Sequence, residues 1–218
     1  MKRSPVRENV GFFGGSFDPI HWGHLVLAEH FLDVLGLDRV LFVPARQSPF
    51  KEERIPADAK DRVEMIRLSI SGNPRFQLEL RELRREGSSY TVDTLRELVA
   101  EHPDWCLHLL LGADAAIGFD RWKEPEAICQ LARIHVARRG GHPPPDLSDL
   151  APFLQQAGQS AEASVVDVPQ IEISSTDIRR RLREGRSIRY LVHPAVEAYL
   201  ESHSLYGARP PAPSSTID

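Results

Sequence analysis

Short strand-like segments alternate with helix-like segments along the first two thirds of the chain, and this alternation is the feature that most constrains the fold. Strands are expected at 9–13, 39–44, 105–112, 133–139 and 164–169, and helices at 23–36, 59–70, 91–102, 125–132, 174–185 and 194–202. Strands that are joined through helices run parallel and are covered on both faces. We therefore expect an α/β fold, a parallel sheet with helices on both faces, followed by a small C-terminal helical part.

The stretch GGSFDPIHWGHL, residues 14–25, directly follows the first expected strand. Ligands of parallel sheets bind at the carboxyl ends of the strands, so the stretch is in the right place for a site. Its glycines match neither GxxxxGK[ST] nor GxGxxG. Gly14 and Gly15 omit Cβ atoms where the backbone must turn or approach a ligand. If a helix starts near Trp22, the imidazoles of His21 and His24 lie at its N-terminus, where the helix dipole favours an anion.

A plain turn with surface histidines is the ordinary alternative for this stretch. A zinc site is disfavoured, because no cysteine or carboxylate partner has ligand-like spacing. The joint occurrence of these residues favours phosphate binding.

A second polar cluster, ISSTDIRRRL, occupies residues 173–182. Ser174 followed by Asp177 is a capping-box-like helix start, which is a sufficient structural reason for both residues. However, the hydroxyls of Ser174, Ser175 and Thr176 and the guanidinium of Arg179 also gather at this helix N-terminus, and such donors suit a polyphosphate tail. The remaining arginines are expected to lie on a solvated helix face; they are Arg180, Arg181 and Arg183.

Composition limits the function classes. The formal net charge of −4 over 218 residues argues against a general nucleic-acid binder, which carries a broad basic excess. The two cysteines lie in no CxxC pattern and are expected to be reduced thiols. No apolar segment is long enough to span a bilayer, and the N-terminus lacks a signal-peptide h-region, so we expect a cytoplasmic protein that does not bind membranes. Residues 1–206 are expected to form one domain, with residues 174–206 as a subregion, and the Pro/Ser-rich residues 207–218 to be disordered.

GGSFDPIHWGH and ISSTDIR together resemble the paired signature of the HxGH nucleotidyltransferase superfamily. Within it, the chain is similar to bacterial nicotinate-nucleotide adenylyltransferases from about residue 9 to about residue 206, including RVLFVP, SSYTVDTL, LLLGADAAIGFDRW and ARRGG. The resemblance implies a Rossmann-like fold and the reaction of ATP with nicotinate mononucleotide to give nicotinate adenine dinucleotide (deamido-NAD) and pyrophosphate. It also implies that Mg²⁺ accompanies the ATP.

The resemblance further implies roles for individual residues. His21, His24 and Arg179 would be catalytic. ATP would be bound by Gly14, Gly15, Ser16, Phe17, His21, His24, Gly112, Asp114, Ser175, Thr176 and Arg179. The acceptor nucleotide would be bound by Lys51, Thr91, Trp122 and Arg139. Helix capping by Thr91 or Asp114 and core packing of Trp122 are the ordinary alternatives for three of these positions. The family often has PPHK where this chain has SPFK at 48–51, so Phe50 replaces a histidine.

The implied chemistry needs no general base, because a nucleotide monophosphate is already an anion near neutral pH. Catalysis would consist of positioning and charge stabilisation. Two alternatives stay open: a sister enzyme acting on nicotinamide mononucleotide or phosphopantetheine, and a nucleotide-binding regulatory protein without turnover. The segment 45–58 is the candidate for a lid, and the oligomeric state is left open.

Overall fold

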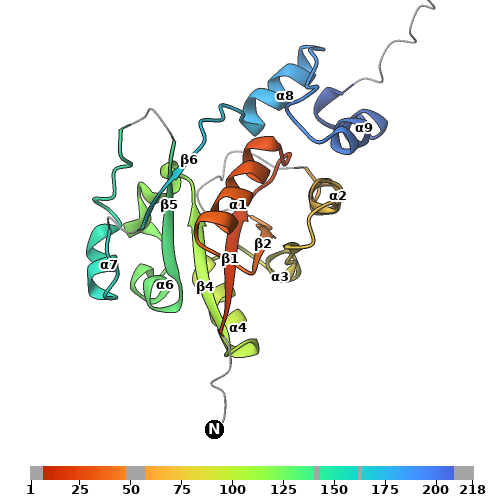
Figure 1. Cartoon of the computed structure of the whole chain (residues 1–218). Helices are drawn as coiled ribbons and strands as arrows, with labels where there is room; N and C mark the ends of the chain where they lie inside the picture. Colours follow the sequence, from red (N-terminus) through yellow and green to blue (C-terminus); the bar gives the residue numbers. More distant parts are fainter. Residues whose placement is uncertain (1–6, 48–56, 140–142, 162–163, 209–218) are drawn as a thin grey trace, which may run out of the picture.

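The framework of the protein is one six-stranded sheet (Figure 1). The computed structural model describes residues 7–47, 57–139, 143–161 and 164–208. The strands are β1 (Glu8–Gly15), β2 (Arg39–Pro44), β3 (Phe76–Leu78), β4 (Trp105–Leu111), β5 (Arg133–Arg139) and β6 (Val165–Val168). All pairings are parallel, in the order β3-β2-β1-β4-β5-β6. The order reverses between β1 and β4, and this switch point is where open α/β sheets bind ligands.

Apolar clusters cover both faces of the sheet, because successive side chains of a strand point to opposite faces. In β2, Val40 and Phe42 join one cluster, whereas Leu41 and Val43 join the other. The first cluster is covered by α1 (Trp22–Val34), α2 (Ala59–Ile70), α8 (Ser175–Arg183) and α9 (Pro194–Ser202). The second is covered by α4 (Thr91–Glu101), α6 (Pro125–Leu131) and α7 (Ala151–Gln156). The expected fold class, a Rossmann-like parallel sheet with helices on both faces, is confirmed.

Some short elements differ from the expectation. β1 continues through Gly14 and Gly15, because these residues pair with Val43 and Pro44 of β2. The edge strand β3 was not expected, since three residues are too few to show a period of two. The other unexpected elements are α3 (Arg81–Arg84), α5 (Ala113–Ala116), α7 and the 3₁₀ turns η1 (Phe119–Arg121) and η2 (Leu205–Gly207).

The C-terminal helices lie beside the first cluster, at the end of the sheet where α1 begins (Figure 1). α9 is tied to α2 by the Tyr199 hydroxyl, which donates to Asp61 Oδ1 at 2.8 Å. The chain remains packed as far as Ala208, which is 4% exposed, and residues 209–218 of the expected tail lie outside the described residues. In the part of the chain that is described, no helix combines the length and apolarity needed to cross a membrane.

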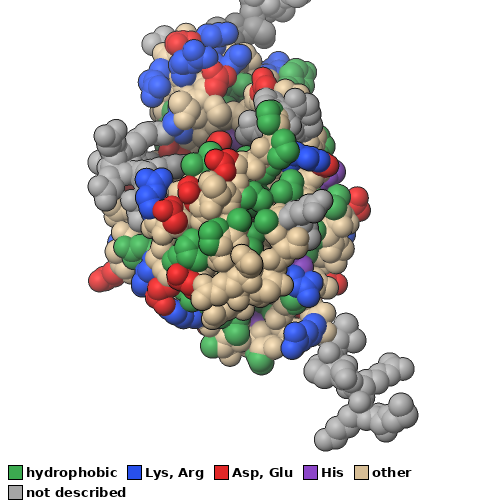
Figure 2. All heavy atoms as spheres, turned by 90° about the vertical axis from the view of Figure 1, so that its left-hand side faces the viewer, with side chains coloured by type: hydrophobic (Ala, Val, Ile, Leu, Met, Phe, Trp, Pro, Cys, Tyr) green, Lys and Arg blue, Asp and Glu red, His purple; other side chains and the backbone are tan. Residues whose placement is uncertain are grey.

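The arginines of α8 divide between the interior and the surface. Arg179 is 8% exposed, whereas Arg180 and Arg183 are exposed. Figure 2 shows Lys and Arg side chains gathering at the top of the molecule, the end that α8 occupies in Figure 1. Arg180 and Arg181 both pair with Asp177 on their own helix. Arg180 and Arg183 therefore lie on the solvated face expected for the arginine run, whereas Arg181 is half-buried.

Candidate active site

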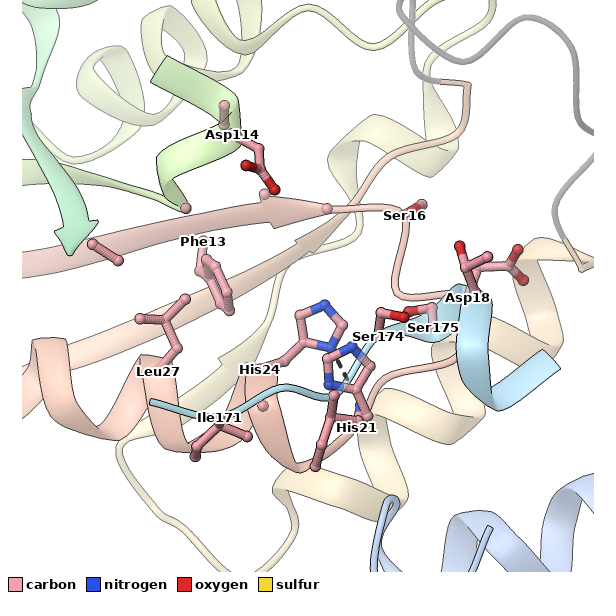
Figure 3. A pocket seen from close by; sticks show the side chains of 18 of the residues that line it. Phe13, Ser16, Asp18, His21, His24, Leu27, Asp114, Ile171, Ser174 and Ser175 are labelled. Carbon is pink, nitrogen blue, oxygen red and sulfur yellow. Dashed lines mark hydrogen bonds between the residues drawn. The ribbon is translucent and has the colours of Figure 1, made fainter. Parts of the chain in front are cut away.

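The two histidines of the HxGH pattern lie together at the start of α1. His21 is the N-cap residue, and His24 occupies the third position of the helix. The backbone N–H of His21 donates to His24 Nδ1 at 3.2 Å, and the two rings stack with their centroids 3.7 Å apart (Figure 3). A neutral His24 with an acceptor at Nδ1 carries its proton on Nε2, and Figure 3 shows that side of the ring facing the cavity. The expected helix start near Trp22 is confirmed.

Gly23 makes room for the His21 ring. A Cβ atom at this position would lie 3.0 Å from His21 Nδ1 and 3.1 Å from His21 Cε1. Such distances are too short for a carbon without a shift of the ring. The group that approaches the backbone at this glycine is therefore the neighbouring imidazole.

His21 is a buried and neutral imidazole. Its side chain is 6% exposed, and burial lowers its pKa to about 4. Its Nδ1 is buried beside Gly23 and faces the backbone N–H of His24 in a capping-box arrangement at the start of α1.

Phe17 supports this pair from behind rather than lining the cavity. Its side chain is 2% exposed, and its ring meets the edge of the His24 ring at 5.1 Å between centroids. It also packs against Phe13 and Phe42. Phe17, one of the residues expected to bind ATP, is therefore not among the described residues that line the cavity, because its ring fills the core beneath His24.

The second polar cluster begins α8 and reaches back to the first. Ser174 caps the helix, since its Oγ accepts from the backbone N–H of Asp177 at 3.1 Å. The Ser175 hydroxyl donates to the carbonyl of Pro19 at 2.9 Å. Two segments more than 150 residues apart in sequence thus meet at one place.

Arg179 completes this junction. Its Nη1 donates to the carbonyl oxygen of Asp18 at 2.5 Å, and its Nη2 donates to the Thr176 hydroxyl at 3.0 Å. The guanidinium is nearly buried, so its position is fixed by these contacts before any ligand arrives. A fixed cation with several donors is suited to binding phosphate oxygens.

A cavity of about 760 Å³ lies between these two helix starts and the carboxyl ends of β1 and β4. Figure 3 shows His21 and His24 on one side, Ser174, Ser175 and Asp18 on another, and Asp114 across from them. The expected ATP-binding residues that line it are Gly14, Gly15, Ser16, His21, His24, Gly112, Asp114, Ser175, Thr176 and Arg179. Asp114 lies in the first turn of α5, and the N-cap of that helix is Gly112. The structure therefore brings together all but one of the residues expected to bind ATP.

The expected acceptor residues do not gather in this cavity. Thr91 is the first residue of α4, with Tyr90 as the N-cap, and Trp122 packs against Phe119 at 5.0 Å between ring centroids. Neither is among the described residues that line the cavity. Lys51 and Phe50 lie outside the described residues, and Arg139 is described only by its backbone, which ends β5.

Two arginines of the site were not expected from the sequence. Arg62 is 1% exposed and donates to three backbone carbonyls, those of Ser16 and Ala45 at 2.8 Å and that of Ala57 at 3.1 Å. It joins the loops that follow β1 and β2. The only available signal was an arginine within an amphipathic helix, which usually faces solvent.

Arg46 follows the end of β2 and lines the cavity. Its backbone N–H donates to Ser89 Oγ at 2.9 Å, and its Nη1 donates to the carbonyl of Arg85 at 3.2 Å. Gln47 lies next to it in the lining, and its carbonyl accepts from the N–H of Ser89 at 3.0 Å. These hydrogen bonds join this end of the cavity wall to the segment that leads into Thr91.

Comparison with known proteins agrees with this geometry. Residues 12–181 match the family model described as cytidylyltransferase-like. Over 203 residues the chain is 41% identical to the probable nicotinate-nucleotide adenylyltransferase of Rhodopirellula baltica, covering 93% of this chain and 95% of that protein. It is 46% identical over 197 residues to a protein of the same name from Thermus thermophilus, covering 90% and 98% of the two chains.

Among solved structures, the chain resembles Plasmodium falciparum nicotinic acid mononucleotide adenylyltransferase complexed with NaAD. The TM-score is 0.72 at 21% identity, over 91% of this chain and 97% of that one. At this identity the likeness supports the fold, and the relatives at 41% and 46% identity support the family. On its sequence, its fold and its paired histidine and serine–arginine clusters, this chain belongs to the nicotinate-nucleotide adenylyltransferase family, within the cytidylyltransferase-like group.

Proposed function

We propose that the protein transfers the adenylyl group of ATP to nicotinate mononucleotide, giving nicotinate adenine dinucleotide and pyrophosphate for NAD biosynthesis. The observation that carries the proposal is the single cavity in which His21 and His24 face Ser175, Thr176 and Arg179 across the carboxyl ends of β1 and β4. The relatives at 41% and 46% identity bear the name of this activity.

The reaction requires positioning more than proton transfer. An oxygen of the acceptor phosphate attacks the α-phosphorus of ATP and forms the new P–O bond. The bond from the α-phosphorus to the bridging oxygen breaks, and its electron pair leaves with pyrophosphate. Because the attacking phosphate is ionised near neutral pH, the described cavity residues need to hold the two substrates in line and stabilise the negative charge that moves to the leaving group.

The cavity offers two kinds of donor for that charge. Arg179 supplies a positive charge at the start of α8, together with the hydroxyls of Ser175 and Thr176. His21 enters the reaction as a neutral donor, because its pKa of about 4 leaves it unprotonated near neutral pH. A phosphate beside the ring would raise that pKa, since an anion favours the protonated form. We assign the β- and γ-phosphates to the α8 side and the bridging oxygen to the histidine side.

Nucleotidyltransferases generally use a divalent metal with ATP, and we propose Mg²⁺ as that metal. No three His, Cys, Asp or Glu side chains among the described residues come together as a metal site. A cavity without such a cluster suits Mg²⁺, because this ion is commonly bound through one or two carboxylates together with substrate phosphates and water. Asp114 is the exposed carboxylate in the lining that would hold it, and the metal would neutralise phosphate charge.

We propose that the acceptor nucleotide lies at the β2 end of the cavity. Arg46 is the lining cation on that side, and it would bind the acceptor's 5′-phosphate. The hydrogen bonds of Arg46 and Gln47 with Ser89 connect this end to Thr91, the predicted contact of the nicotinate ring. The predicted roles of Trp122, Lys51 and Arg139 at the acceptor remain part of this proposal.

Pyrophosphate release tests the proposal directly. The purified protein is supplied with ATP and Mg²⁺ and with nicotinate mononucleotide, nicotinamide mononucleotide or phosphopantetheine in turn. We expect the highest kcat/KM with nicotinate mononucleotide. A preference for either other acceptor would reassign the substrate, and ATP binding without release with any acceptor would indicate a regulatory protein.

A further inference from the structure

Asp18 is a buried carboxylate in the cavity whose partners come from distant parts of the chain. Its side chain is 3% exposed, and it lies next to Ser175 at the edge of the cavity (Figure 3). Its carbonyl oxygen accepts from Arg179 Nη1, and its Oδ2 lies 3.8 Å from the same nitrogen. Asp18 therefore holds the guanidinium through both its backbone and its side chain.

The other carboxylate oxygen is held from the C-terminal side of the molecule. Asp18 Oδ1 accepts a short hydrogen bond from the hydroxyl of Tyr206 and a second one from the backbone N–H of Ala57 at 3.1 Å. With Oδ1 occupied by these two donors, the carboxylate presents Oδ2 to Arg179. The orientation of the carboxylate thus depends on a hydroxyl 188 residues away in the sequence.

The hydroxyl of Tyr206 is itself held in place by the local fold. Tyr206 lies in η2 with a φ of 55°, in the left-handed region that non-glycine residues rarely adopt. Its ring packs against the cluster that α8 and α9 cover, and Ala208 just beyond it is buried. The packing of the ring and the hydrogen bond to Asp18 together hold the hydroxyl in place.

We propose that Tyr206 is a positioning residue for the ATP phosphates, acting through Asp18 on Arg179. The proposal rests on the proposed function for the identity of the ligand. The C-terminal turn η2 thereby becomes part of the ATP site without touching ATP. Tyr206 and Asp18 act in series, so loss of either one weakens the same ion pair with the guanidinium, whose hydrogen bonds to the Asp18 carbonyl and the Thr176 hydroxyl remain.

The variant Tyr206→Phe tests the proposal by removing one oxygen atom. Tyr199→Phe is a matched control, because Tyr199 also donates from the C-terminal part to a buried aspartate, Asp61, which is not among the described residues that line the cavity. ATP binding is measured by calorimetry on the full-length protein, with thermal melting as the check on folding. We expect Tyr206→Phe to raise the Kd for ATP about tenfold, equivalent to about 1.4 kcal/mol, and Tyr199→Phe to leave the Kd unchanged.

The series arrangement gives a second readout that a purely structural role would not produce. Asp18→Asn should raise the Kd for ATP as much as Tyr206→Phe does, and the double variant should be no worse than either single variant. In steady-state kinetics, KM for ATP should rise while KM for the acceptor stays constant.

Equal Kd values in Tyr206→Phe, Tyr199→Phe and the wild type would overturn the proposal, as would fully additive effects of Tyr206→Phe and Asp18→Asn. If Tyr206→Phe does not fold, an unchanged Kd in Asp18→Asn overturns it instead. A wild-type protein that binds ATP but releases no pyrophosphate would overturn only the proposed function, because the binding comparison still stands.

Discussion

Replacing His24 by alanine removes a donor whose position is fixed by three contacts. The ring is held by the hydrogen bond from the His21 backbone at 3.2 Å, by stacking on His21 at 3.7 Å, and by the edge contact with Phe17 at 5.1 Å. These three restraints direct Nε2 into the cavity before substrate arrives. Little reorganisation is then needed when charge develops on the bridging oxygen, and this is the condition under which a single donor contributes most.

The expected loss follows from that preorganisation. Removing one fixed transition-state donor lowers kcat by about 10²–10³-fold, or about 2.7–4 kcal/mol. The acceptor lies on the other side of the α-phosphorus in the proposed arrangement, so KM for nicotinate mononucleotide should change little. The assay is pyrophosphate release at saturating ATP and acceptor, near neutral pH.

His30→Ala is the matched control for this variant. His30 lies on the same helix, and its Nε2 forms a hydrogen bond with the carbonyl of Asp167 at 2.6 Å. It is not among the described residues that line the cavity. We expect kcat of His30→Ala to match the wild type. A kcat of His24→Ala within about tenfold of the wild type, in a protein with an intact melting transition, would refute the reasoning.

Three further predictions concern the site and the core. Gly23→Ala should lower kcat about tenfold, because the new Cβ would displace the His21 ring, whose Nδ1 lies 3.0 Å away. The melting temperature should not fall, since alanine favours a helix by about 1 kcal/mol over glycine. A loss of stability that accompanies the loss of activity would contradict this prediction. Arg46→Ala should raise KM for the acceptor about tenfold, as expected for one lost charge-assisted hydrogen bond, and should leave KM for ATP unchanged. Initial-rate kinetics with each substrate varied in turn would measure both constants. Lowering the pH should destabilise the fold, because burial lowers the pKa of both His108 and His135 to about 4, so the unfolded chain binds more protons below its ordinary histidine pKa. This contribution to the free energy of unfolding is fully present above pH ~6.5 and is lost toward pH 4; the loss reaches about 2 kcal/mol per histidine by pH ~5. Urea unfolding at several pH values measures it, and the free energy of unfolding should depend less steeply on pH in His135→Gln than in the wild type.

Most of the residues that the sequence predicts to bind ATP lie together in one cavity. They could be recognised because glycines, histidines and hydroxyl residues occur jointly at two strand-to-helix junctions, and Phe17 is the exception that does not line the cavity. The direction of the Phe17 side chain could not be predicted from the sequence, because neighbouring positions of a loop can point into a cavity or into the core. Its direction depends on Phe13 and Phe42, which approach it from β1 and β2.

The acceptor half was harder to predict from the sequence. Neither Thr91 nor Trp122 is among the described cavity residues, and the lining cation on that side is Arg46, which no motif marks. Basic residues are common on surfaces, so an arginine after a strand carries no signal until its neighbours are known.

The amino-acid sequence by itself determined the alternation of strands and helices, the parallel sheet and the two phosphate-binding segments, because periodicity and junction motifs are local properties of the chain. Only the tertiary structure decided which polar groups support those segments. The burial of Arg62 beneath two loops and the contact between Tyr206 and Asp18 join residues distant in sequence. Such contacts depend on how helices pack across the sheet, and no local pattern records them.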